Sequence, residues 1–177
     1  MLKEGQIRIP SGCAIAAIID KKGNPINGSE IIKSIALMHD RSNGLGGGFA
    51  AYGIYPEHAD DYAFHVFYDS NDARAHCEEY LFKHFNVDVA ERIPTKKIES
   101  IENGPDIWRY FGKPNRVRMQ NARMDELEYV VQCVTKVNDQ FDGSYIFSSG
   151  KNMGCFKAVG YPEDCLLYTS DAADDLI

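Results

Sequence analysis

Two kinds of hydrophobic pattern alternate between residues 62 and 93, and only a fold that mixes strands with helices accommodates both. Residues 62–68 are rich in aromatic side chains, which favours a strand. Ser70 or Asp72 then suits the N-cap of a helix whose apolar positions follow at helical spacing. Residues 87–93 return to a strand-like pattern. This strand–helix–strand order predicts an α+β fold.

The strongest helical pattern lies between residues 127 and 141. Its apolar residues recur three and four positions apart and so share one helical face. They are Leu127, Val130, Val131, Val134, Val137 and Phe141. A turn then leads into a predicted strand at 144–148, and residues 155–159 predict a further strand.

Residues 94–122 lack a clear period and are rich in Pro, Gly, Asn and charged residues. This composition predicts mostly loop with short turns. Trp108, Tyr110 and Phe111 are large apolar side chains within the segment, and we expect them to pin the loop to the body of the protein.

The N-terminal part opens with a continuous apolar run at residues 13–19, followed by a polar stretch at 20–24. A run of this length predicts a buried strand closed by a turn. Ser29 is the expected N-cap of a helix whose apolar residues lie between 31 and 38. Residues 49–55 predict another strand.

Charge and cysteine content narrow the classes of function. The 177 residues carry a formal net charge of −7, which argues against nucleic acid or an anionic membrane as the main partner, because both need a basic face. No apolar run reaches the length of a membrane span, and the start lacks a signal-peptide core, so we expect a cytoplasmic protein. The 5 cysteines are an odd number and widely spaced, which indicates neither a disulfide framework nor a structural zinc site.

Isolated side chains invite functional readings that their spacing does not favour. His65, His76 and His84 flank the predicted middle helix without a metal-ligand spacing, and we interpret them as surface or core residues. Cys77 and Cys133 fall on apolar helical faces and are expected in the core. The glycines at 44–48 lack the Lys-Ser/Thr of a phosphate-binding loop.

Four segments, taken in order, resemble one enzyme family. They are residues 11–18, where a cysteine opens an apolar strand, residues 37–49, rich in glycine after the first helix, and residues 151–153 and 156–164. Their order and spacing resemble class II glutamine amidotransferases, closest to the stand-alone glutaminase domain of archaeal-type glutamate synthases. The resemblance implies an N-terminal nucleophile hydrolase fold, an αββα layered sandwich, incomplete at the C-terminus.

The resemblance also implies a division of the chain. Residues 1–12 are a leader removed on maturation, residues 13–164 are the N-terminal part of the amidotransferase domain, and residues 60–122 are an insertion of the family. Residues 165–177 resemble the translation of a sequencing-library adapter, so we interpret them as an artefact tail. We expect the native part of the sequence to stop near Asp164.

The implied catalytic residue is Cys13. By its position in the chain alone, a cysteine that starts an apolar strand is a packing residue. The resemblance instead makes it the N-terminal nucleophile, whose α-amine titrates at about 7.7–8.0 and acts as the base. The thiolate attacks L-glutamine, ammonia leaves, and water hydrolyses the thioester. The implied partner is a glutamate synthase subunit with FMN and an iron–sulfur cluster, whereas this chain itself is expected to hold no cofactor and no metal.

Three parts of that family's active site have no matching motif before Asp164. They are the arginine that binds the substrate carboxylate, the Asn-Gly pair of the oxyanion hole, and the acidic residue that holds the substrate amine. Asn43-Gly44 and Asn103-Gly104 read better as turns, and Arg41 as a structural residue. The substrate-binding residues are therefore unassigned, and we predict negligible glutaminase activity for the 177-residue polypeptide.

Two other functions remain open at this point. The first is a non-catalytic regulatory or ligand-binding α+β module, in which residues 62–93 belong to a ferredoxin-like strand–helix–strand unit and Cys13 is core. The second is an N-terminal nucleophile amidohydrolase that acts on an amide other than glutamine.

Overall fold

The computed structural model describes residues 13–42, 44–94, 104–158 and 161. The chain divides into two compact units. Residues 50–155 form one, which we call the sheet unit, and the described residues before 50 and after 155 belong to the other, the N-terminal unit. The structure has strands and helices in both parts of the chain, so the predicted α+β class is confirmed. Within the described ranges, no helix has the length and apolarity needed to cross a membrane.

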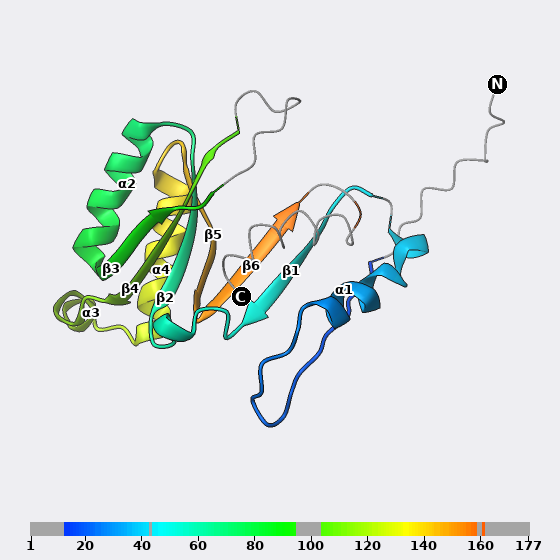
Figure 1. The fold of residues 1–177 in the computed structure, drawn as a ribbon. Helices are drawn as coiled ribbons and strands as arrows, with labels where there is room; N and C mark the ends of the chain where they lie inside the picture. The colour runs from blue at the N-terminus through cyan, green and yellow to red at the C-terminus, as the bar shows by residue number, and fades with distance from the viewer. Residues whose placement is uncertain (1–12, 43, 95–103, 159–160, 162–177) are drawn as a thin grey trace, which may run out of the picture. The chain divides into compact units, whose positions relative to one another are not determined.

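The sheet unit is built on a four-stranded antiparallel sheet in the order β3-β4-β2-β5 (Figure 1). Its elements follow the chain as β2 (Tyr62–Tyr68), α2 (Asn71–His84), β3 (Phe85–Arg92), β4 (Asp106–Pro114), α3 (Arg116–Ala122), α4 (Glu126–Gln140) and β5 (Ser144–Lys151). Apart from the short α3, this β-α-β-β-α-β order is the ferredoxin-like, or split βαβ, arrangement. This arrangement includes β5, so the ferredoxin-like unit extends beyond the predicted residues 62–93 and ends at Lys151.

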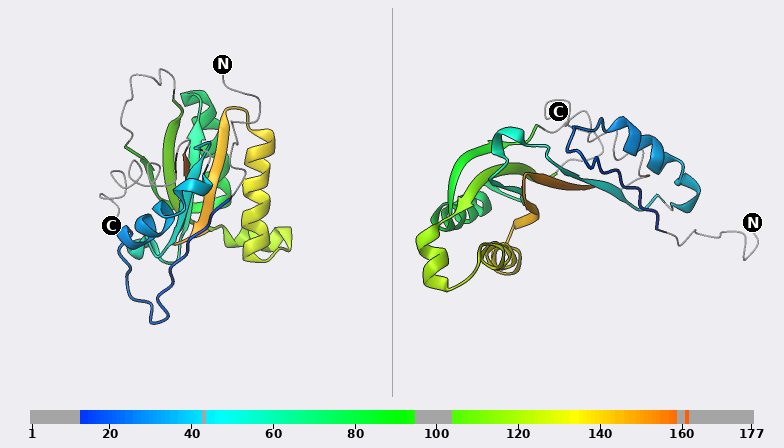
Figure 2. Two further views of the ribbon diagram at one scale, coloured as in Figure 1. Left: turned by 90° about the vertical axis from the view of Figure 1, so that its right-hand side faces the viewer. Right: turned by 90° about the horizontal axis from the view of Figure 1, so that it is seen from below.

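Helices α2 and α4 lie on the same side of the sheet (Figure 2). Between them and the sheet lies the main core, to which β2 contributes Tyr62, Phe64, Val66 and Tyr68. Cys77 on α2 and Cys133 on α4 are buried in this core, as their helical positions predicted. Alternate residues of β2 reach the core because successive side chains of a strand point to opposite faces.

Local capping signals position both helices. Ser70 is the N-cap of α2, and its side chain accepts a hydrogen bond from Ala73 N–H. Asp125 caps α4 in the same way, by accepting from Glu128 N–H. Each cap satisfies one backbone donor that the first turn of a helix leaves without a partner. The predicted strand at 62–68 and both long helices are thus confirmed.

The prediction of a loop at residues 94–122 is wrong for the residues of this segment that the structure describes. Residues from Asp106 onward form β4 and α3, and β4 is a central strand, paired with β2 on one side and β3 on the other. Trp108, Tyr110 and Phe111 are strand residues rather than pins of a loop. The composition misled because Gly112 is required there: a Cβ at that position would lie 2.7 Å from the Asn86 carbonyl oxygen. Strand pairing across the sheet outweighed the local composition.

The N-terminal unit contains α1 (Ser29–Ala36) and the short 3-10 helix η1 (His39–Arg41). β1 (Gly47–Tyr52) pairs with β6 (Met153–Ala158) in a second, two-stranded sheet. Gly48 comes so close to the Phe156 carbonyl that a Cβ would not fit. The prediction that Ser29 is the N-cap of α1 is wrong. Gly28 is the N-cap, and the Asn27 side chain accepts from Ser29 N–H at 2.8 Å.

The buried strand predicted at residues 13–19 is also absent. These residues are in neither a helix nor a strand, and Ile15 and Ile19 are 88% and 84% exposed. A strand is buried only when neighbouring strands pair with it and another layer covers it. An apolar run indicates that a segment suits burial, but the run itself does not specify the strands or the layer that would bury it.

The apolar residues of α4 differ in solvent exposure, and this difference allows a test of how the helix packs. Val137 is fully buried in the core, whereas Val131 on the same helix is exposed. We expect Val137→Ala to lower the free energy of unfolding by about 2 kcal/mol, because it removes buried methyl groups and leaves a cavity. Val131→Ala should change it by less than about 0.5 kcal/mol.

The two substitutions have the same effect on intrinsic helix propensity, so Val131→Ala is a matched control. Urea unfolding followed by circular dichroism measures both. Equal losses in the two variants would contradict the packing of α4 described above.

Candidate functional site

Cys13 is exposed, and it precedes every described helix and strand. Among the described residues no hydrogen bond to its sulfur is found, so the structure does not place a general base or an oxyanion hole beside it. The remaining described cysteines differ in access: Cys77 and Cys133 are buried, and Cys155 is half-buried. Burial raises the pKa of the Cys77 and Cys133 thiols, so both stay protonated near neutral pH.

The sheet unit holds two polar clusters, one on each side of its sheet. The first lies on the face opposite α2 and α4. Strand register places His65 of β2 beside Arg109 of β4, and Arg109 beside Glu91 of β3. Tyr55 joins them, with its hydroxyl oxygen 2.6 Å from His65 Nε2. We call these four residues the His65 cluster.

His65 is fully buried at the centre of β2. Burial lowers its pKa to about 3, and the charge of Arg109 acts in the same direction. Burial also raises the pKa of the Tyr55 hydroxyl. The tyrosine therefore keeps its proton, and its hydroxyl is hydrogen-bonded to a neutral imidazole.

Arg109 connects the sheet to the segment that covers this face. Its Nε donates to Glu91 Oε1 at 2.9 Å, and its guanidinium lies 5.1 Å from the Tyr55 ring and 5.2 Å from the Phe111 ring. His58 stacks on Phe111 with ring centroids 3.9 Å apart. His65 has 0% exposure, so its imidazole has no access to a substrate, and its contact with Tyr55 holds residues 53–61 against the sheet.

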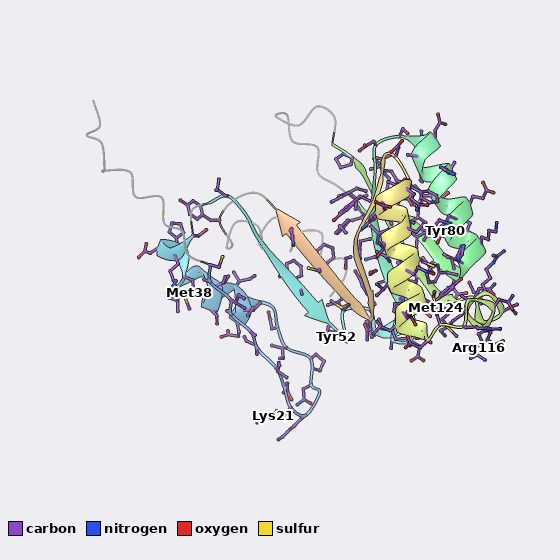
Figure 3. The ribbon with its side chains drawn as sticks, turned by 180° about the vertical axis from the view of Figure 1, so that it is seen from behind. Lys21, Met38, Tyr52, Tyr80, Arg116 and Met124 are labelled. Carbon is purple, nitrogen blue, oxygen red and sulfur yellow. The ribbon has the colours of Figure 1, made fainter. Side chains whose placement is uncertain are left out.

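The second cluster lines a pocket of about 570 Å³ between α2, α3 and α4. This size is within the range of small-molecule sites. We call it the helix pocket. Its lining residues are Tyr80 and His84 of α2, Arg118, Asn121 and Ala122 of α3, and Tyr129, Gln132, Cys133, Thr135, Lys136, Asp139 and Gln140 of α4. Figure 3 marks Tyr80 where α2 and α4 lie side by side.

Contacts with residues of α2 and α4 fix His84 in this pocket. Its Nδ1 lies 2.7 Å from the Tyr129 hydroxyl oxygen and 3.7 Å from Cys133 Sγ. Tyr80 stacks on its ring with centroids 4.2 Å apart. Burial lowers the pKa of His84, and the positive charges of Arg118, Lys136 and Lys83 lower it further.

The structure separates the three histidines that the sequence places near one another. His65 lies on the helix-free face, His84 lines the helix pocket, and His76 stacks on Phe141 with ring centroids 4.7 Å apart. In the part of the chain that the structure describes, no three His, Cys, Asp or Glu side chains are grouped as metal ligands.

Sequence reasoning missed the helix pocket because one of its walls, α3, lies in the segment predicted as loop. A local signal was available. Asn115 follows a proline, caps α3, and accepts a hydrogen bond from Arg118 N–H at 3.2 Å. Asn is a strong N-cap residue, so this pair marks a helix start.

Comparison with known proteins adds one relative and no family assignment. No family model matches the chain. Over 158 residues, or 88% of its length, the chain is 41% identical to an uncharacterized protein of Archaeoglobus fulgidus. The matched part is 42% of that protein, so the chain spans less than half the length of this relative.

The buried imidazole of His65 predicts how stability depends on pH. Burial lowers its pKa to about 3 in the folded protein, below the usual histidine value of 6.5. Between these values the unfolded state binds more protons, so stability falls as the pH is lowered from 6.5. From about pH 6.5 to about pH 5 the expected loss is about 2 kcal/mol, at about 1.4 kcal/mol for each pH unit.

His65→Gln should remove most of this loss, because glutamine does not titrate and still offers Tyr55 an acceptor. Urea unfolding at about pH 7.5 and about pH 5 measures the effect. His76→Gln, at an exposed position of α2, is the control and should retain the wild-type pH dependence. An unchanged slope in His65→Gln would show that other groups carry it.

Proposed function

We propose that this chain carries the nucleophile of a class II glutamine amidotransferase, which hydrolyses L-glutamine to glutamate and ammonia. The observation that carries the proposal is the contrast between cysteines. Cys13 is exposed, whereas Cys77 and Cys133 are buried with protonated thiols. A nucleophile needs access to substrate and a thiolate form, and of these three residues Cys13 alone meets the first condition. The order of segments around residues 11–18 and 37–49 supports the same family.

The proposed reaction uses groups that Cys13 acquires on maturation. Removal of residues 1–12 gives it a free α-amine, which titrates at about 7.7–8.0 and takes the thiol proton. The thiolate sulfur bonds to the carboxamide carbon of glutamine, and the carbon–nitrogen bond breaks with release of ammonia. Water then cleaves the thioester, which yields glutamate and restores the thiol.

The αββα sandwich of N-terminal nucleophile hydrolases is part of the same proposal. The exposed apolar side chains of Ile15 and Ile19 suit a strand that gains its partners and cover from other residues of the protein. Residues that match the oxyanion hole and the substrate arginine do not occur in the described ranges, so we expect them elsewhere in the complete enzyme. The ammonia would serve a glutamate synthase subunit that carries FMN and an iron–sulfur cluster.

A second candidate function belongs to the sheet unit alone. Residues 62–151 contain the complete ferredoxin-like set of elements with its own core, and the helix pocket opens on its helical side. These observations favour a ligand-binding or regulatory module. Such a module and the amidotransferase can coexist in one protein, because the two units are separate compact bodies.

The test of the main proposal is covalent labelling of the longest protein that the gene encodes, produced in its native cells. Intact mass should show a chain that begins at Cys13. A diazoketone analogue of glutamine should alkylate the Cys13 sulfur with loss of dinitrogen, and glutamine should protect against the label.

Cys13→Ala should abolish both the label and ammonia release, while Cys155→Ala, at a half-buried cysteine, should retain both. A retained Met1 together with an unlabelled Cys13 refutes the nucleophile. Labelling that another amide blocks better than glutamine favours an amidohydrolase of different substrate.

A further inference from the structure

We propose that the helix pocket binds a small organic anion with at least two acidic groups, such as a polycarboxylate or a phosphate ester. The inference rests on the ligand-binding role proposed for the sheet unit and names its ligand class. The pocket is formed by α2, α3 and α4 within one compact unit, and its volume of about 570 Å³ suits a metabolite-sized ligand.

The cations of the pocket come from two different helices. Arg118 lies on α3 and Lys136 on α4, and both line the pocket. Lys136 Nζ lies 5.4 Å from the centre of the Tyr80 ring. In the described part of the chain neither side chain has a carboxylate within ion-pair distance. Two such cations at one concave site attract an anion that reaches both.

The balance of charge in this pocket is opposite to that of the whole protein. Asp139 is the acidic residue of the lining, against Arg118 and Lys136, whereas the chain has a formal net charge of −7. Burial is the main cause of the lowered pKa of His84, and the positive charges of Arg118, Lys136 and Lys83 lower this pKa further. A positive pocket in an acidic protein selects anions over cations.

Neutral donors complete the recognition of acidic groups. Burial raises the pKa of Tyr129 to about 12, so its hydroxyl stays protonated, and it is hydrogen-bonded to His84 Nδ1 at 2.7 Å. In the tautomer in which Nδ1 accepts this bond, His84 Nε2 carries a hydrogen and is a donor. The side-chain amides of Asn121 and Gln132 also line the pocket and supply N–H donors.

Binding of an anion should be coupled to protonation of His84. The groups that face this imidazole are Tyr80 and Lys83 on α2, Arg118 on α3, and Tyr129, Cys133, Lys136 and Asp139 on α4. An anion beside these cations offsets their repulsion of the imidazole proton and favours the charged ring. Affinity should therefore rise as the pH falls through the range in which His84 titrates.

Isothermal titration of the full chain tests the proposal with two probes, citrate and pyrophosphate. We expect saturable binding of at least one probe at about pH 5.5 and weaker binding at about pH 7.5. Preference for citrate identifies a carboxylate ligand, and preference for pyrophosphate a phosphate ester. Arg118→Ser and Lys136→Ser should each weaken binding about tenfold, as expected for a lost charge-assisted hydrogen bond.

Arg116→Ser is the matched control. Arg116 lies on α3 but does not line the pocket, and Figure 3 marks it at the start of that helix. Arg116→Ser removes the same charge as Arg118→Ser and should leave the affinity for both probes unchanged. His84→Gln should retain binding at about pH 7.5 and lose the gain at about pH 5.5.

Absence of saturable binding by either probe overturns the anion site. Equal weakening by Arg116→Ser and Arg118→Ser also overturns it, because binding is then to diffuse surface charge. Neither result affects Cys13, whose labelling by the glutamine analogue is measured separately. Binding that persists in Arg118→Ser and Lys136→Ser leaves the sheet unit a ligand-binding module but refutes this pocket as its site.

Discussion

Pairing of β4 with β2 on one side and β3 on the other is the contact on which the rest of the sheet unit depends. Without β4, β3 has no neighbour in the sheet, since the order is β3-β4-β2-β5. The pairing requires close backbone approach at Gly112, where a side chain would collide with the Asn86 carbonyl. It also brings Arg109 between His65 and Glu91. Strand β4 thus supplies both the backbone hydrogen bonds that join the sheet and the central arginine of the polar row His65–Arg109–Glu91.

The two faces of the sheet are covered by different kinds of contact. On one face, α2 and α4 cover a core of aromatic and aliphatic residues, the latter including Val66, Leu81 and Val137. On the other face, the described residues of the sheet unit place no α-helix, and the His65 cluster contacts residues 53–61, which include the short 3-10 helix η2 (Pro56–His58). There the buried neutral imidazole of His65 is hydrogen-bonded to Tyr55, and Arg109 is hydrogen-bonded to Glu91. The lowered pKa of His65 makes this arrangement sensitive to acid.

Access decides which of the candidate groups can do chemistry. His65 and Cys133 are chemically versatile residue types, but both are buried, and their surroundings keep them in the neutral form. Cys13 is exposed and lies in the other unit. The chain therefore combines an accessible thiol with a separate module that has its own pocket, and a proposal for either does not depend on the other.

Local patterns in the sequence were sufficient for β2, for α2 and α4, and for the burial of Cys77 and Cys133, and they narrowed the cap of α2 to Ser70 or Asp72. Each of these depends on residues within a few positions of one another, where side-chain period and backbone capping act directly. Tertiary structure alone decided that Asp106–Pro114 is a central strand, that residues 13–19 stay exposed, and that His84, Arg118 and Lys136 share a pocket. Those outcomes depend on partners distant in the chain, and no local period records which partner a segment will meet.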